Sequence, residues 1–525
     1  MKKDDVLQLT IEDIGSDGEG IGHIDLSAGS YDEPQRRYTI FVKDAVIGDV
    51  VTVKIMKALQ SFAYAKLVSI DKPSPDRVEP KCPIAAQCGG CQIQALDYNK
   101  QLEFKQKKVM NDLVRIGGFD ESLISEITDP IIGMEDPYCY RNKEQVPVGT
   151  DKDGNPVTGF YASHTHSIVP MTSCAIGDPE NDLILNTILD YMKAENVPSY
   201  DEKTGTGLLR HILIRSGVYS REVMICLVVN GDSLPSENKL VELLRLLPFV
   251  TSISINTNKS RGNVILGRKL RVLWGEESIV DTLHVYKVEY EESTRNPAAS
   301  LHDDSAASGN DTSGIDASRT AHFIPTGEAV NFRISPLSFY QVNPKQTEKL
   351  YSIVLEYCKL NGHETAWDLY CGIGTISLFL AKHAKEVYGV ESVEDAVRDA
   401  RNNARLNNIE NVEFETGRAE DVLPAYVDRH KSEHRKHPVD VIVVDPPRKG
   451  LDDVTIGVML AMAPPRIVYV SCDPATMSRD LKKLTAAQKD AAGNKYSYKL
   501  QRVQPVDQFG HTVHVETVVL LTREV

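Results

Sequence analysis

A cysteine stands just after an apolar run near the C-terminal end of the chain. Cys472 follows the run at 467–470, and Asp473 and Pro474 prevent a strand from continuing past it. A packing cysteine more usually lies within such a run. A thiol at the mouth of a buried strand is therefore placed to act as a nucleophile.

Two carboxylates follow related patterns. Asp445 ends the apolar run in VDVIVVDPPRKG, and Glu516 interrupts an apolar strand in HTVHVETVVLLTRE, where a carboxylate is costly without a partner or a task. Carbon 5 of a pyrimidine accepts a methyl group from a sulfonium only after a thiolate has added to carbon 6, and a base must then remove the carbon-5 proton. These residues suit that chemistry, with Cys472 as nucleophile and Glu516 as base.

A cofactor site is indicated by the stretch TAWDLYCGIGTISLFLAKHAKEVYGVE. Gly372 and Gly374 permit a tight turn and a close approach to a ligand, and Glu391 ends the next strand, where it can accept hydrogen bonds from ribose hydroxyls. Asp368 precedes the glycines. An ordinary strand-to-helix turn is the alternative for the glycines alone. Because no third glycine follows, the pattern favours S-adenosyl-L-methionine over a dinucleotide.

Three cysteines are closely spaced in CPIAAQCGGCQ, and a fourth stands far downstream in MTSCAI. They are Cys82, Cys88, Cys91 and Cys174. Four thiolates suit either zinc or an iron–sulfur cluster, and the spacing alone leaves both open. The other cysteines with no such neighbours, Cys139, Cys226, Cys358 and Cys371, are typical of packing residues.

The chain of 525 residues is expected to form several regions, and the helices and strands of these regions position the residues above. Short alternating strands with Gly-rich turns predict a small OB-like β-barrel over 1–72, and a central α+β domain with the cysteines is expected over 73–290. Residues 291–321 are acidic and poor in apolar side chains, which predicts a disordered insertion. Strand and helix patterns then alternate over 322–525, so we expect a doubly wound, Rossmann-like parallel sheet there. With the cofactor pattern above, this region is the expected class I methyltransferase domain. The fold class is multidomain α/β.

Composition excludes several classes of protein. No stretch approaches the ~20 apolar residues that span a bilayer, and no apolar signal segment follows the N-terminus. We therefore expect a cytoplasmic protein that does not bind a membrane. The net charge of −15 argues at first against nucleic acid, but it is unevenly spread. Residues 203–275 hold eleven Lys or Arg against four Asp or Glu, a net +7. Candidate phosphate contacts are Arg141, Lys143, Arg210, Arg215, Lys259, Arg261, Arg268, Lys269 and Arg271.

Six motifs together resemble those of the RNA uridine-C5 methyltransferases, the family that makes 5-methyluridine in bacterial 23S rRNA and tRNA. The motifs are SFYQVN (338–343), DLYCGIGT (368–375), GVE (389–391), DPPRKG (445–450), VSCDPAT (470–476) and HVETV (514–518). The resemblance implies Cys472 as nucleophile and Glu516 as base. It implies cofactor contacts from Gln341, Tyr370, Glu391 and Asp445, with Asp445 also near the uracil and Phe339 holding the flipped base.

The resemblance extends to the N-terminal segment, which is similar to the RNA-binding TRAM domain of the ribosomal members. It implies 23S rRNA as the partner of a monomeric enzyme, and a [4Fe–4S] cluster rather than zinc on the four cysteines. Two departures from the family pattern are Gln508 and Gly510, where Met and Pro are more usual. The alternatives are a tRNA-directed member, an amino-group methyltransferase in which Cys472 is idle, and a non-enzymatic RNA-binding assembly factor.

Overall fold

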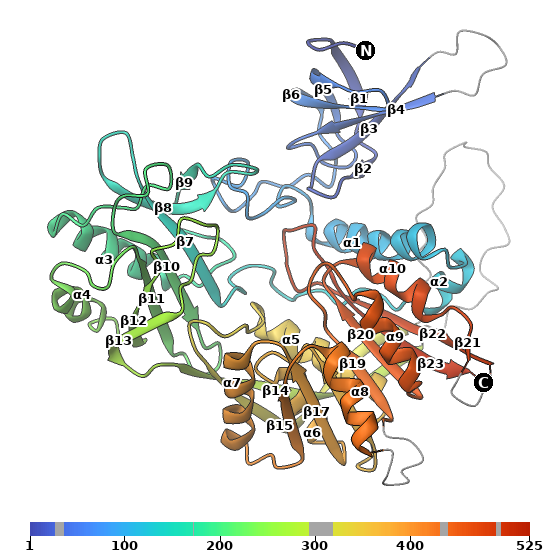
Figure 1. Cartoon of the computed structure of the whole chain (residues 1–525). Helices are drawn as coiled ribbons and strands as arrows, with labels where there is room; N and C mark the ends of the chain where they lie inside the picture. Colours follow the sequence, from blue (N-terminus) through green and yellow to red (C-terminus); the bar gives the residue numbers. More distant parts are fainter. Residues whose placement is uncertain (27–35, 172, 293–318, 431–438, 490–494, 525) are drawn as a thin grey trace.

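The computed structural model describes residues 1–26, 36–171, 173–292, 319–430, 439–489 and 495–524. Figure 1 shows a small N-terminal β-barrel, a central sheet beside it, and a C-terminal sheet flanked by helices. No helix among these described residues is long and apolar enough to cross a membrane.

The N-terminal region confirms the expected β structure. It forms one sheet in the order β1-β5-β6-β4-β3-β2, and contacts between β1 and β3 close the sheet on itself. Alternation in β5 buries Val51, Val53 and Ile55, as a period of two requires. The strands are β1 (Val6–Thr10), β2 (Asp13–Ile14), β3 (Gly20–Leu26), β4 (Arg36–Val42), β5 (Val50–Ala58) and β6 (Phe62–Lys72).

The central region is built on a sheet in the order β13-β12-β11-β10-β7-β8-β9. Its middle strands β10 and β11 are buried at every residue, so both faces of the sheet are covered. The elements are β7 (Lys143–Thr150), β8 (Pro156–Tyr161), β9 (Ile168–Pro170), α3 (Asn181–Ala194), β10 (Leu209–Ser216), β11 (Val223–Val229), α4 (Glu237–Leu244), β12 (Val250–Thr257) and β13 (Lys269–Gly275).

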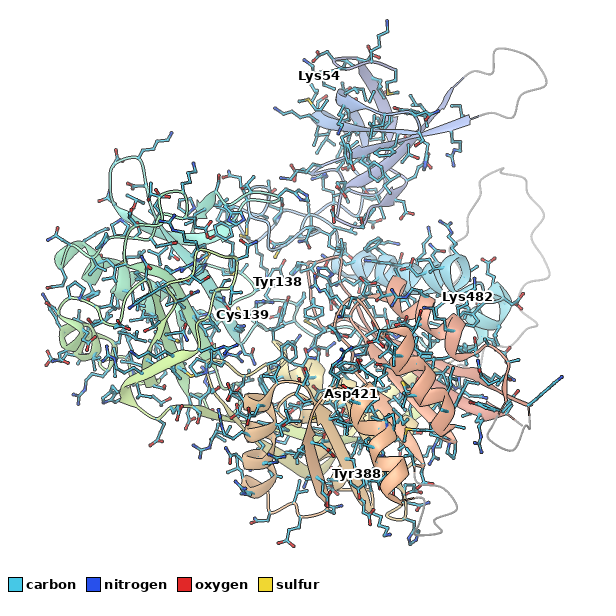
Figure 2. All side chains as sticks on the ribbon, in the orientation of Figure 1. Lys54, Tyr138, Cys139, Tyr388, Asp421 and Lys482 are labelled. Carbon is cyan, nitrogen blue, oxygen red and sulfur yellow. The ribbon has the colours of Figure 1, made fainter. Side chains whose placement is uncertain are left out.

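Two helices that precede this sheet in the chain do not pack on it. α1 (Tyr98–Asp112), the π-helix η1 (Leu113–Gly117) and α2 (Glu121–Ile127) lie against α10 and β22 of the C-terminal region (Figure 1). Val109 and Ile124 share one hydrophobic core with Trp367. The segment after α2 returns to the central sheet, and Figure 2 shows Tyr138 and Cys139 between the two regions.

A long antiparallel pair, β14 (Ile279–Glu292) and β15 (Arg319–Ile334), connects the central region to the C-terminal one. The predicted acidic insertion at 291–321 falls between these strands. Its interior, 293–318, lies outside the described residues, and its two ends are strand residues rather than disordered chain.

The C-terminal sheet has the order β18-β17-β16-β19-β20-β23-β22-β21. Strands β16 to β20 are parallel as predicted, whereas β23 runs antiparallel to both β20 and β22. The sheet is therefore mixed, because β23 follows β22 through the loop at 507–515 rather than through a helical crossover. The strands are β16 (Thr365–Leu369), β17 (Glu386–Glu391), β18 (Val412–Thr416), β19 (Val441–Val444), β20 (Arg466–Ser471), β21 (Gln488–Lys489), β22 (Lys495–Val506) and β23 (Glu516–Glu524).

Helices cover both faces of this sheet, and successive side chains of one strand enter different cores. Val443 and Val468 belong to one core, while their neighbours Ile442 and Ile467 belong to the other. The strand order reverses between β16 and β19, which is where sheets of this kind bind ligands. The helices are α5 (Pro344–Cys358), α6 (Thr375–Ala381), α7 (Glu394–Leu406), α8 (Ala419–His430), α9 (Asp453–Met462) and α10 (Pro474–Leu484).

Candidate active site

A cavity of about 940 Å³ opens at the carboxyl ends of β16, β17, β19 and β20. It brings together, from six separate segments of the chain, most of the residues that the sequence singled out. Those that line it are Phe339, Gln341, Asp368, Tyr370, Gly372, Glu391, Asp445, Cys472 and Glu516.

The predicted nucleophile and base come together through strand register. Ser471 of β20 pairs with Thr517 of β23 in the antiparallel ladder. Cys472, the residue after Ser471, and Glu516, the residue before Thr517, therefore lie at the same end of the sheet. Asp445 follows the last residue of the neighbouring parallel strand β19 and joins them at this rim. Three ionisable groups distant in sequence thus share one pocket wall.

Burial raises the pKa of each of these three groups. Burial, and then the neighbouring carboxylates of Glu516 and Asp445, raise the pKa of the Cys472 thiol to about 12, which the Arg448 guanidinium only partly opposes. Burial, and then Asp445, raise the pKa of Glu516 well above its usual value. Burial raises the pKa of Asp445 to about 7. The thiol therefore needs a further positive charge in the pocket before it ionises at neutral pH.

One oxygen of the predicted base is free to receive a proton. Glu516 is buried, and its Oε2 has no hydrogen-bond partner in the described part of the chain. A buried carboxylate with an unpartnered oxygen and a raised pKa is typical of a functional site rather than of a packed core.

The turn after β16 forms the opposite wall. Tyr370 and Gly372 have φ of +69° and +55°, and a Cβ on Gly372 would meet no atom within 4 Å, so its backbone faces open space. Glu391, at the end of β17, accepts hydrogen bonds from the Gly372 amide at 3.2 Å and from the Val393 amide at 2.9 Å. These bonds fix the carboxylate at the pocket edge, where it can accept from hydroxyl groups.

Asp368 lies deeper, within β16. It accepts a hydrogen bond of 2.6 Å from the Ser377 hydroxyl, and burial raises its pKa to about 7. Its second oxygen has no partner among the described residues. The carboxyl group is therefore held by α6 on one side and open toward the pocket on the other.

Gly374 was predicted as a cofactor contact, but it is not among the residues that line the cavity. It caps the start of α6 with φ of +84°, and a Cβ there would approach Phe414 to 2.9 Å. The glycine is therefore required by helix packing.

The pocket rim carries an exposed aromatic ring. Phe339 is 70% exposed, and Gln341, two residues further on, is buried. The backbone between the central and C-terminal regions is fixed here, because Asn142 Nδ2 donates to the Gln341 carbonyl at 3.1 Å and the Arg215 guanidinium donates to the Ser338 carbonyl. An exposed ring at the mouth of a pocket can stack on a base.

Some pocket residues were missed from the sequence. Arg448 stands within the DPPRKG motif itself, so the motif offered a signal for it. Tyr351 and Phe509 also line the pocket, but they come from α5 and from the segment before β23. Nothing in their local sequence pattern indicates a site.

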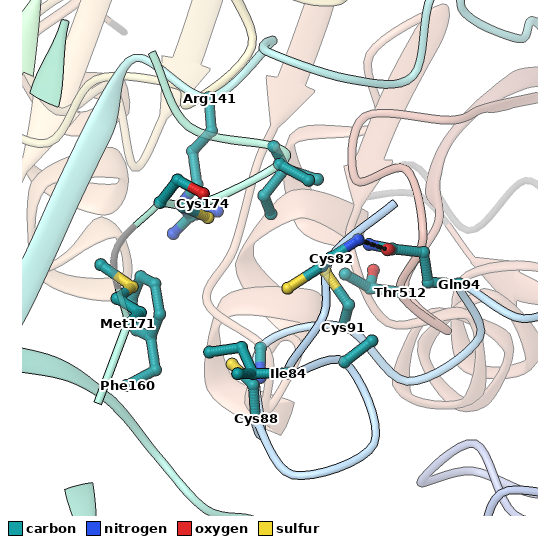
Figure 3. Close-up of a pocket in the computed structure, with 15 residues that line it drawn as sticks. Cys82, Ile84, Cys88, Cys91, Gln94, Arg141, Phe160, Met171, Cys174 and Thr512 are labelled. Atoms are coloured by element: carbon teal, nitrogen blue, oxygen red, sulfur yellow. Dashed lines mark hydrogen bonds between the residues drawn. The ribbon is translucent and has the colours of Figure 1, made fainter. Parts of the chain in front are cut away.

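A second cavity, of about 230 Å³, is lined by the four predicted cysteines (Figure 3). Cys82, Cys88 and Cys91 lie on one loop, and Cys174 comes from the opposite wall. Burial, and then the other thiols, raise the pKa of Cys91 to about 12. Apart from Arg141, the surroundings are largely apolar side chains such as Phe160, Met171 and Ile176.

The four thiols line a space larger than a single ion. No group of three or more Cys, His, Asp or Glu side chains in the described ranges is arranged to hold a metal ion. Zn²⁺ would draw each sulfur to about 2.3 Å from one point, whereas a four-iron cluster keeps its thiolates further apart. A cavity of about 230 Å³ between the four sulfur-bearing walls has room for several atoms.

The structure corrects part of the prediction that the basic side chains of the central region contact RNA phosphates. Arg210 and Arg215 are each only 4% exposed, and Arg210 donates to the carbonyl of Asn258 at 2.8 Å. Others are engaged in ion pairs, Lys259 and Lys269 with Asp232 and Arg271 with Glu237. Arg141 lines the cysteine cavity. Arg261 and Arg268 are exposed and stay candidates for phosphate contacts. The excess of positive charge thus partly serves to hold the central region together.

Comparisons with known proteins agree with this arrangement. Residues 323–524 match the protein-family model described as tRNA (Uracil-5-)-methyltransferase, and residues 4–68 match the TRAM domain. A protein of Clostridium tetani named "Uncharacterized RNA methyltransferase" is 40% identical over 523 residues, which are 99% of this chain and 97% of its own. A protein of Halalkalibacterium halodurans with the same description is 39% identical over 522 residues, 99% of this chain and 98% of its own.

A solved structure resembles the whole chain. It is the Pyrococcus abyssi tRNA (uracil-54, C5)-methyltransferase in complex with S-adenosyl-L-homocysteine, with 25% sequence identity and a TM-score of 0.67. The similarity covers 98% of this chain and 100% of that one, so it extends over all the regions described above.

Proposed function

The chain belongs to the RNA uracil-5-methyltransferase family, and from this premise we propose that it methylates carbon 5 of uridines in 23S rRNA with S-adenosyl-L-methionine as methyl donor. The observation that carries the proposal is the single pocket in which Cys472, Glu516 and Asp445 meet beneath the exposed ring of Phe339. A thiol and a carboxylate side by side are what methylation of a pyrimidine carbon requires.

In the proposed reaction, Cys472 Sγ bonds to carbon 6 of the uracil, and the electron pair of the 5,6 double bond moves toward carbon 5. Carbon 5 then takes the methyl group. Glu516 accepts the proton from carbon 5, and the bond between Sγ and carbon 6 breaks as the double bond re-forms. The unpartnered Oε2 of Glu516 and its place in the same pocket as Cys472 support this role.

The donor fits the remaining wall of the pocket. S-adenosyl-L-methionine, when bound, supplies a methyl group on a positively charged sulfur, and a positive charge here favours the ionised form of the Cys472 thiol. Glu391 is placed to hold ribose hydroxyls, and the backbone at Gly372 permits close approach. Gln341, Tyr370, Asp368 and Asp445 complete the proposed contacts. The S-adenosyl-L-homocysteine bound to the Pyrococcus relative, which is the donor without its methyl group, supports this choice of donor.

A [4Fe–4S] cluster is proposed for the second cavity, held by Cys82, Cys88, Cys91 and Cys174. Its support is the meeting of four thiols along one cavity that has room for several atoms. Its role would be structural, because the cavity lies between the loop after the barrel and the central region.

The choice of RNA has two candidates. The TRAM domain at residues 4–68 favours ribosomal RNA by analogy with the ribosomal members of the family. The tRNA alternative is favoured by the Pyrococcus relative, whose structure matches the chain from end to end and which acts on uracil 54 of tRNA. In vitro methylation of 23S rRNA and of tRNA transcripts, with the modified nucleoside located by mass spectrometry, decides between them. Methylation of tRNA alone would overturn the 23S proposal.

The chemistry is tested with RNA that contains 5-fluorouridine. Fluorine at carbon 5 cannot leave as a proton does, so the adduct between Sγ and carbon 6 is trapped after methyl transfer. We expect a covalent protein–RNA complex that requires the methyl donor and is absent in Cys472→Ala. An amino-group methyltransferase or a non-enzymatic assembly factor would form no complex, and that result would overturn the proposed reaction.

A further inference from the structure

The segment from Asp507 to Val515 borders both cavities. Phe509, and Glu516 directly after the segment, line the active-site pocket, whereas Thr512 lines the cysteine cavity. The segment contains Gln508 and Gly510, the two positions that depart from the family pattern. Its contacts show how it is held between the two sites.

Helix α1 holds the segment at its start. Lys105 is 0% exposed, and its Nζ lies 2.6 Å from Asp507 Oδ1 and 2.9 Å from the Phe509 carbonyl oxygen. The Tyr98 hydroxyl donates to Asp507 Oδ2 at 2.7 Å. A buried charge pair with further hydrogen bonds tolerates little displacement, because loss of one partner leaves the other charge uncompensated. Phe509 is thereby fixed through its own backbone.

The same helix holds the middle of the segment through a glutamine. Gln101 Oε1 accepts from the His511 amide at 3.0 Å, and Gln101 Nε2 lies 3.2 Å from His511 Nδ1. Burial lowers the pKa of His511 to about 4, so the ring is neutral at pH 7 and Nδ1 can accept from the amide group. His511 has φ of +65°, a strained conformation that the surrounding contacts must maintain.

The cysteine loop holds the segment from the other side. The His511 carbonyl accepts from the amides of Gln92 at 3.0 Å and Ile93 at 3.1 Å, the two residues that follow Cys91. Tyr140 donates to the Gly510 carbonyl at 3.1 Å. The ring of Tyr138, which Figure 2 places between the central and C-terminal regions, lies 4.4 Å from the His511 ring, centroid to centroid. Movement of the cysteine loop is therefore transmitted to His511.

Glu516 depends on this arrangement. Its Oε2 has no side-chain or backbone partner in the part of the chain that is described, so no hydrogen bond at that oxygen corrects its position. Pairing with Val506 of β22 holds the backbone of Glu516 on one side, and the segment that Gln101 and His511 hold leads directly into it.

We propose that residues 507–515 couple the cysteine cavity to the methyl-transfer pocket, with Gln101 and His511 as positioning residues for Phe509 and Glu516. The inference rests on the proposed function, because the proposed function assigns to Glu516 the role of base. It makes the cysteine site a determinant of the rate of the chemical step and not only of stability.

The first test removes the glutamine contacts without removing volume. In Gln101→Met we expect methylated RNA that contains ordinary uridine to be released from the protein about tenfold more slowly under single-turnover conditions, because Glu516 acts after methyl transfer and a small misplacement of reacting groups is costly. The Kd for the same RNA should stay within about twofold, because binding surfaces are unchanged. Gln106→Met is the matched control, since Gln106 is a buried glutamine of the same helix that accepts from the Ile131 amide instead.

The glutamine experiment has clear outcomes. An unchanged rate in Gln101→Met overturns the inference. Equal slowing in Gln106→Met, or slowing that only follows weaker RNA binding, overturns it too, because a general loss of helix stability would then explain the effect.

The second test starts from the cysteine cavity and does not depend on activity. Hydrogen exchange of the amides from 507 to 516 is compared in Cys91→Ser and in Cys139→Ser, since Cys139 is an exposed cysteine outside the cavity. We expect exchange about tenfold faster or more in Cys91→Ser alone. Unchanged exchange in Cys91→Ser overturns the coupling. A wild-type protein that forms no covalent complex contradicts the proposed function, whereas a normal wild type with unaffected variants contradicts only this inference.

Discussion

The two cavities both contain thiols with a raised pKa, yet for different reasons. The pKa of Cys472 and that of Cys91 are each raised to about 12, in the first case by burial and then carboxylates, in the second by burial and then other thiols. One thiol among acids suits a transient bond to carbon, whereas four thiols among apolar side chains suit permanent ligation. In both cavities a positively charged ligand is what would ionise the sulfur.

The cavities are also built differently. The active-site pocket is assembled at strand ends, where sheet register sets the positions of Cys472 and Glu516. The cysteine cavity is assembled from loops, with Cys174 on a wall distant in sequence from the other three. Strand ends fix a side chain more firmly than loops do, so a catalytic pair is better placed on the sheet.

The sharpest test of this contrast is Cys472→Ala. Loss of the only proposed nucleophile is expected to lower methyl transfer to RNA by about 10³-fold or more, because carbon 5 is then not activated. Transfer of labelled methyl groups from the donor to RNA measures this. Cys139→Ala, at an exposed cysteine outside both cavities, should keep wild-type activity. Substantial activity in Cys472→Ala would mean that the thiol is not the nucleophile.

The carboxylate beside the thiol is tested next. In Glu516→Gln the carbon-5 proton is not removed, so methylated RNA is expected to stay bound covalently to the protein and turnover to fall about 10²-fold. Denaturing gels detect the retained RNA without any fluorinated base. Glu524→Gln is the control, because Glu524 is exposed at the far end of the same strand. Release at the wild-type rate from Glu516→Gln would contradict the role of base.

The ligand role of the other thiols predicts a different phenotype. After anaerobic purification, the wild type is expected to contain iron and sulfide, and Cys88→Ser to lose most of both together with several degrees of melting temperature, because ligand binding contributes to folding. Cys139→Ser should retain both elements. Zinc without sulfide in the wild type would replace the proposed cluster with a zinc site.

The smallest effect concerns the pH dependence of stability at Asp368. Its pKa in the folded protein is about 7 against 3.8 for an unperturbed group, so the folded state holds a proton that the unfolded state releases. The contribution of Asp368 to the free energy of unfolding is fully present below pH ~4. It is lost as the pH rises to ~7, by up to about 1.4 kcal/mol per pH unit.

Asp368→Asn carries no such proton. Its melting temperature relative to wild type is therefore expected to rise between pH 5 and pH 7 and to stay level above that range, as thermal unfolding at several pH values would measure. A difference that is constant across this range would contradict the raised pKa of Asp368.

Much of the active site could be predicted from the sequence because its residues stand where apolar runs stop. Cys472 and Asp445 each follow such a run, and parallel strands bring their carboxyl ends to one edge. The burial of Arg210 and Arg215 could not be predicted. Their partners are backbone carbonyl groups of distant residues, and the sequence around an arginine does not indicate such a contact. The same holds for the antiparallel return of β23 and for the packing of α1 on the C-terminal core.

The sequence by itself determined which side chains can do chemistry and which strands end beside them, since alternation of apolar and polar residues reflects burial locally. Only the tertiary structure decided that Gln101 reaches His511 across 410 positions and that Thr512 and Phe509 face different cavities. Such contacts join segments distant in sequence, and their geometry follows from packing of the whole chain rather than from any local pattern.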